Sequence, residues 1–138
     1  MIPGLTVGNL TITHAMCCDD VRREDNGKLL IIGVYLDDVR VSSFPNLIVV
    51  RTLVFSRSSP GIAPHVAFRA MLNDEQVMAV DYKPEPDAVL EPDRQFMFDL
   101  PQIHLQTVHP SVLSVEVSEF GREWTSILRL PIASTDNL

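Results

Sequence analysis

The stretch CCDDVRREDNGKLLIIGVYL, from Cys17 to Leu36, decides the fold class of this chain. Its Asn26-Gly27 pair is the strongest short-range signal for a β-hairpin, because a type I′ turn needs two residues that tolerate positive φ. A two-residue turn at this point pairs Asp25 with Lys28. The segment that follows, Leu29–Leu36, is apolar on both faces except at Gly33, which predicts a strand inside a sheet that is covered on both sides.

Two more hairpins are predicted further along the chain. The second turns at Asn73-Asp74 and pairs Leu72 with Glu75, so that Val66, Phe68 and Ala70 share one face with Val77 and Ala79. The third turns at Phe120-Gly121 and pairs Glu119 with Arg122. Its alternation predicts that Trp124 lies in the core beside Leu113, Val115, Val117 and Leu128.

Together with the β-rich segments Leu47 to Phe55 and Arg94 to Leu100, these hairpins give about eight short strands and no substantial amphipathic helix. The prediction is one all-β domain over residues 1–138, an antiparallel β-sandwich of Ig-like or C2-like type. A small closed β-barrel is the alternative, since the sequence does not determine strand order.

Composition excludes several classes of function. With 46% hydrophobic and 21% charged residues the chain is not disordered, and its net charge of -7 repels nucleic acid and anionic lipid. We find no run long enough for a membrane span and no secretory signal, and therefore expect a cytoplasmic protein. Cys17 and Cys18 are neighbours on a strand and point to opposite faces, so we expect two buried free thiols.

The most unusual local feature is the run of carboxylates at Asp19 and Asp20 within an apolar strand. One of them should be buried or nearly so, because neighbouring residues face opposite sides of a strand. In the register set by Asn26-Gly27, Asp20 and Arg22 share a face, with room left by Gly33 and with Tyr35 nearby. We interpret Asp20 and Arg22 as a structural ion pair; the alternatives are a ligand or partner surface formed by Asp19, Asp20, Arg22 and Tyr35, or a local β-bulge. Arg51, inside an apolar strand, should pair with a carboxylate or stack on an aromatic ring.

Metal and catalytic signals are weak. Asp37 and Asp38 could join Asp19 or Asp20 in a calcium site, but no calcium-loop pattern occurs. His14, His104 and His109 could meet in space, yet their spacing matches no zinc motif. The sequence contains no nucleophile elbow and no phosphate-binding glycine loop, so we expect no cofactor and no enzymatic activity.

The pattern Cys18-Asp19-Asp20-Val21-Arg22, followed by Asn26-Gly27-Lys28 and Ile32-Gly33-Val34-Tyr35, resembles a family of small bacterial and phage-borne domains of unknown function. The resemblance covers about the first 40 residues and implies no activity. The leading hypothesis is a non-enzymatic protein-interaction or structural module that binds a protein partner or a second copy of itself. The alternative is a small-molecule or calcium-binding β-sandwich that uses the acidic ends of the first hairpin.

Overall fold

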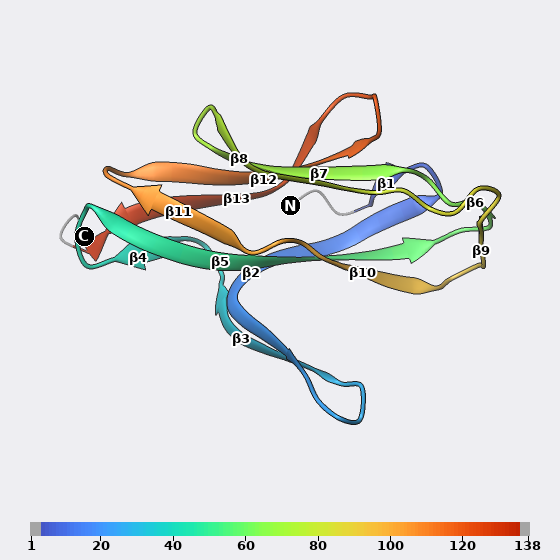
Figure 1. Ribbon diagram of the computed structural model, residues 1–138, viewed down its shortest axis with the longest axis horizontal. Coiled ribbons are helices and arrows are strands. Elements are labelled where there is room, and N and C mark those ends of the chain that lie inside the picture. Colours follow the sequence, from blue (N-terminus) through green and yellow to red (C-terminus); the bar gives the residue numbers. More distant parts are fainter. Residues whose placement is uncertain (1–3, 136–138) are drawn as a thin grey trace.

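The computed structural model describes residues 4–135 and confirms the all-β fold, with two sheets packed face to face (Figure 1). The first sheet consists of β1 (Leu5–Val7), β2 (Leu10–Arg23), β3 (Leu29–Tyr35), β5 (Asn46–Ser58), β10 (Gln95–Asp99) and β11 (Ile103–Thr107). The second consists of β4 (Val39–Val41), β13 (Thr125–Ser134), β12 (Ser111–Glu119), β7 (Val66–Leu72) and β8 (Glu75–Tyr82). A small ribbon of β6 (Gly61–Ile62) and β9 (Val89–Leu90) lies at one end.

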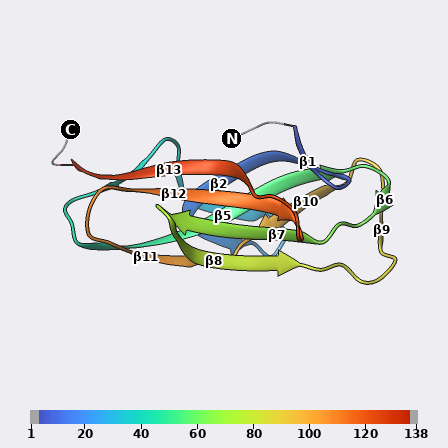
Figure 2. The same cartoon turned by 90° about the horizontal axis from the view of Figure 1, so that it is seen from above.

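Each sheet is built around long central strands. In the first sheet β5 pairs with β2 on one edge and with both β10 and β11 on the other. In the second, β12 lies between β13 and β7, an order visible from above (Figure 2). Every ladder is antiparallel except that between β4 and β13. The structure describes thirteen strand segments where the sequence predicted about eight, because short pieces such as β1, β4, β6 and β9 are too brief to show a periodic pattern.

The core lies between the two sheets and is formed by alternate residues of the central strands. Its largest fully buried side chains include Phe68, Ile12, Leu113, Leu130 and Ile132. Full burial of such a side chain stabilises the fold by about 1.5–3 kcal/mol, so these residues dominate the stability. Cys17 and Cys18 are both buried and both free, as predicted.

The first hairpin differs from the prediction by one residue. The Glu24 amide donates to the Lys28 carbonyl and the Gly27 amide donates to the Glu24 carbonyl, so the loop is one residue longer than expected. Only Gly27 has positive φ there, as in a type I turn followed by a glycine bulge. The predicted pairing of Asp25 with Lys28 is therefore wrong, and every later pair shifts: Asp20 lies opposite Ile32, where Gly33 was expected.

For the other two hairpins, the predicted turns are correct and the predicted residue pairs beyond the turns are wrong. Leu72 pairs with Glu75 as predicted, but a bulge between Ala70 and Met71 then sets Ala70 opposite Met78. In the third hairpin Thr125, not Trp124, lies opposite Val117. This one-residue shift moves the Trp124 side chain out of the core.

Trp124 is consequently 37% exposed. Its ring lies under the Arg69 guanidinium, 4.5 Å from ring centroid to Cζ, and Ile127 is fully buried instead. The prediction that Trp124 is a core residue is wrong, because bulges and longer loops change which side of the strand faces inward.

Candidate interaction surface on the β2–β3 hairpin

The hairpin formed by the end of β2 and by β3 projects from the sandwich (Figure 1). β2 pairs with β5 only as far as Cys18, whereas its pairing with β3 continues to Arg23. The last residues of β2 therefore lie in a two-stranded arm that extends beyond the main sheet. We call residues 19–35 the arm.

The arm exposes apolar side chains to solvent. Leu30, Ile32 and Val34, alternate residues of β3, are 45%, 37% and 41% exposed, and Leu36 just after the strand is 85% exposed. The prediction that this segment lies inside a sheet and is covered on both sides is thus wrong for the single chain. Within residues 4–135, β3 pairs with β2 alone.

A polar contact at the base of the arm involves Asp19, Gly33 and Tyr35. The Tyr35 hydroxyl donates a hydrogen bond of 2.5 Å to Asp19 Oδ1. Gly33 has a φ of 69°, and a Cβ atom at this position would lie 2.2 Å from Asp19 Oδ2. Glycine is therefore required here both by the backbone conformation and by the close approach of the carboxylate. Burial, together with this hydrogen bond, raises the pKa of Tyr35 to about 12, so the hydroxyl keeps its proton at neutral pH.

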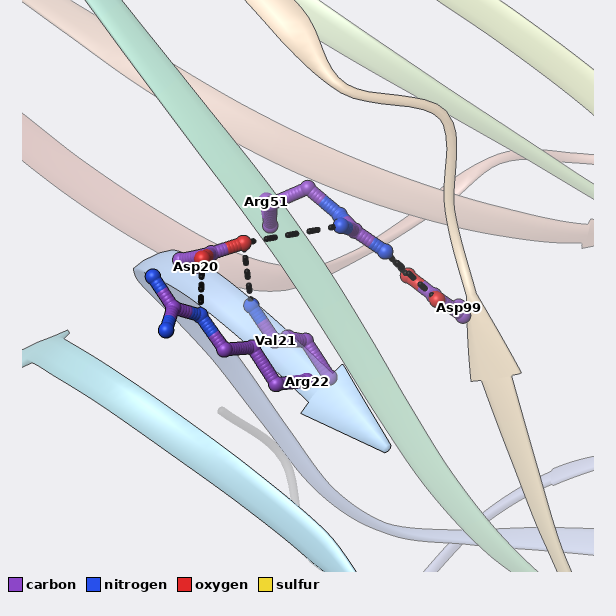
Figure 3. A network of polar contacts seen from close by, with 5 residues as sticks. All are labelled: Asp20, Val21, Arg22, Arg51 and Asp99. Carbon is purple, nitrogen blue, oxygen red and sulfur yellow. Dashed lines mark hydrogen bonds and ion pairs between the residues drawn. The ribbon is translucent and has the colours of Figure 1, made fainter. Parts of the chain in front are cut away.

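A second polar network starts from Asp20 and continues onto the main sheet (Figure 3). Asp20 Oδ2 accepts from Arg22 Nε at 3.1 Å, and its Oδ1 accepts from the Val21 amide at 2.9 Å. The hydrogen bond from Arg22, followed by that from the Val21 amide, lowers the pKa of the Asp20 carboxyl. Asp20 Oδ1 also lies 4.0 Å from Arg51 Nη1.

Arg51 links the network to β10. Its Nη2 donates to both carboxylate oxygens of Asp99, at 2.7 Å and 2.6 Å. The prediction that Arg51 pairs with a carboxylate is confirmed. The hydrogen bond with Asp99 raises the pKa of the Arg51 guanidinium, which stays charged.

The four predicted site residues thus form two separate pairs. Asp20 contacts Arg22 and Asp19 contacts Tyr35. The expectation that one of the two carboxylates is buried is wrong: Asp19 is exposed and the Asp20 side chain is 43% exposed, because the arm has left the sandwich at this point. Gly33 makes room for Asp19, where the sequence suggested Asp20, as a result of the one-residue shift in register.

The two thiols are held in an unreactive state. Burial raises the pKa of the Cys17 thiol to about 11, and Cys17 Sγ lies 3.3 Å from Thr52 Oγ1 in a buried hydrogen bond. Burial also raises the pKa of Cys18. Because the thiolate is the nucleophile and the metal ligand, both cysteines act as small core residues at neutral pH.

The metal sites considered from the sequence find no support among the described residues. In the range 4–135, no group of three or more His, Cys, Asp or Glu side chains is arranged to hold a metal ion. Asp38 instead accepts from Arg40 Nε at 2.7 Å, and the His109 ring contacts the Pro110 carbonyl at 3.0 Å. The same part of the chain contains no helix of the length and apolar character needed to span a bilayer.

Sequence reasoning missed the exposed edge, which is the most distinctive feature of this surface. The length of β2 could have indicated it, because the strand continues to Arg23 whereas its pairing with β5 ends at Cys18. Comparison of the sequence with protein-family models and with curated proteins gives no match.

Proposed function

We propose that the protein is a non-enzymatic protein-interaction module that docks through β3, and that its partner is a second copy of the same chain. The observation that carries the proposal is the exposure of Leu30, Ile32 and Val34 on a strand whose outer edge pairs with no other strand in residues 4–135. An open strand edge offers unpaired amides and carbonyls, and apolar side chains beside it add affinity. The buried free thiols fit a cytoplasmic location.

The other sheet edges within the described residues are blunted in the ways natural proteins use. β1 and β4 have only three residues each. β8 carries Glu75 and Asp81, and β10 ends in Asp99. In β11 the exposed side chains are those of His104 and Gln106, which are polar. By contrast, β3 has seven residues, none of them charged and none of them proline.

A second copy fits this edge because identical strands are self-complementary when they pair antiparallel about a two-fold axis. Each strand then supplies the same donors and acceptors that it needs from its partner. The alternate apolar side chains of the two copies would lie side by side and cover one another. The Gly33 kink limits the flat part of the edge to Leu29–Ile32, which favours a short, specific contact over open-ended stacking.

The net charge of the arm opposes such a contact only weakly. The chain has a net charge of -7, which repels a second copy at long range. The arm contains four acidic residues and three basic ones, for a net charge of -1, so the net charges of two arms repel each other only weakly.

The experiment is sedimentation velocity on the full chain over a wide range of protein concentration. Ile32→Lys places a charge on the proposed contact and should shift the dimer toward monomer, since an unpaired charge in an interface is unfavourable. The matched control is Val108→Lys, which adds the same charge at an exposed apolar residue, 62% exposed, outside the arm. Circular dichroism checks that both variants keep the β fold.

A wild-type dimer that Ile32→Lys dissociates and Val108→Lys preserves supports the proposal. A wild type that stays monomeric at every concentration overturns self-association. A dimer that both variants weaken equally would show that the contact lies elsewhere on the surface.

A further inference from the structure

A second site lies at the end of the sandwich near the β6–β9 ribbon. A cavity of about 500 Å³ opens between the sheets there. Its wall includes Phe96 and Phe98 from β10, Tyr82 from β8 and Leu90 from β9. A cavity of this size is within the range that binds small organic ligands, which is about 300–1,000 Å³. None of its lining residues belongs to the arm.

The inner wall of the cavity is aromatic. The Tyr82 and Phe98 rings lie 5.0 Å apart between centroids, and Phe98 packs 5.1 Å from the buried Phe68. Phe96, which also lines the cavity, is 37% exposed. Flat apolar groups pack well on such rings in offset or edge-to-face geometry, so the lining favours an aromatic ligand body.

The polar side chains of the wall are engaged, with one exception. The Tyr82 hydroxyl donates to the Asp99 carbonyl at 3.1 Å, and Asp81 Oδ2 lies 2.5 Å from His65 Nε2. Lys83 also lines the cavity, and its ammonium forms no ion pair with any residue between 4 and 135. Seven of the eleven basic residues have a carboxylate partner within residues 4–135, so Lys83 belongs to a minority.

We propose that this cavity binds a small aromatic carboxylate, with the ring against Phe96 and Phe98 and the carboxylate paired with Lys83. The apolar wall supplies affinity by burial of the ring, and the ammonium supplies the preference for an anion. The Asp81 carboxylate of the same wall is hydrogen-bonded to His65, whereas the Lys83 ammonium has no ion-pair partner in residues 4–135 and can pair with an anionic ligand. The site is independent of the arm and goes beyond the proposed role in self-association.

Isothermal titration calorimetry with three naphthalene probes tests this assignment. Naphthalene-2-carboxylate, naphthalene-2-methanol and naphthalene-2-methylammonium share one ring and differ in charge. We expect the carboxylate to bind most tightly and the ammonium most weakly. Lys83→Ala should weaken carboxylate binding about tenfold and leave binding of the alcohol unchanged, since it removes only the ion pair.

Two further variants separate the cavity from the surface. Phe96→Ala removes an exposed part of the wall and should weaken binding of both the carboxylate and the alcohol, with little effect on folding. Lys28→Ala removes a lysine from the arm and should leave all three affinities unchanged. Absence of carboxylate binding at millimolar probe overturns the proposal, and so does carboxylate binding that survives both Lys83→Ala and Phe96→Ala. Equal affinity for carboxylate and alcohol would overturn the role of Lys83.

Discussion

Substitution of Gly33 by alanine tests the geometry at the base of the arm. Gly33 has a φ of 69°, and the left-handed conformation costs a residue with a Cβ about 1–2 kcal/mol. The new Cβ would also lie 2.2 Å from Asp19 Oδ2 and 2.8 Å from Asp19 Cγ, so the carboxylate must move away. That movement breaks the hydrogen bond from Tyr35, which contributes about 1 kcal/mol. We therefore expect Gly33→Ala to reduce the free energy of unfolding by about 2–3 kcal/mol.

Gly121→Ala is the matched control. Gly121 has a φ of 85°, but no atom lies within 4 Å of a Cβ built there. Its substitution should cost only the backbone contribution, about 1–2 kcal/mol. The difference between the two variants isolates the contact with Asp19.

Urea unfolding followed by circular dichroism gives the free energy of unfolding of each variant. The slope of this free energy against urea concentration should be the same for all of them. In the Asp19→Ala background Gly33→Ala should cost about 1 kcal/mol less than in the wild type, because the hydrogen bond is already absent. If Gly33→Ala is no more damaging than Gly121→Ala, or if Asp19→Ala brings no relief, the register that sets Asp19 beside Gly33 is wrong.

Three further outcomes are expected. Burial raises the pKa of the Cys17 thiol from 9.0 to about 11, so the native state favours the protonated thiol. The resulting contribution to stability is complete below pH 9 and is lost as the pH rises to about 11. Over this range the free energy of unfolding should fall by about 2–3 kcal/mol more in the wild type than in Cys17→Ala. Trp124→Ala should cost at most about 1 kcal/mol in urea unfolding, the value of an exposed cation–π contact with Arg69, whereas Phe68→Ala should cost about 3–5 kcal/mol; a reversal of this order would restore Trp124 to the core. Arg51→Ala should lower the thermal midpoint more than Arg22→Ala, because the Arg51 side chain is the less exposed of the two and binds both oxygens of Asp99; equal midpoints would contradict this.

The sequence was sufficient for fold class and for the positions of turns. Alternation and the Gly, Pro and Asn punctuation are local properties, so the all-β fold and the turns near Gly27, Asn73 and Gly121 could be predicted. It was not sufficient for register. A single extra residue in a loop or a bulge reverses the two faces of a strand, and the periodic pattern alone does not report it. The misplacement of Trp124 has this cause.

The polar residues of the candidate site were predicted from the sequence, but the contacts among them were predicted only in part. The pairing of Asp20 with Arg22 depends on residues two apart on one strand, so it survives the shift in register. The contact of Asp19 with Tyr35 depends on how β2 faces β3, and it required the correct register. The cavity near Lys83 joins side chains from β8, β9 and β10, whose proximity follows from the packing of the two sheets. No local pattern in the sequence carries that information.

The largest disagreement between sequence and structure lies in β3 and bears directly on function. A strand that is apolar on both faces is the pattern of a strand buried on both sides, and the sequence of Leu29–Tyr35 has this pattern. The single chain nevertheless leaves Leu30, Ile32 and Val34 exposed. Natural sequences seldom keep such a strand open at an edge, because it promotes pairing with other chains. The sequence pattern and the structure agree if another molecule covers these side chains of β3. The concentration dependence of the sedimentation coefficient decides whether that molecule is a second copy.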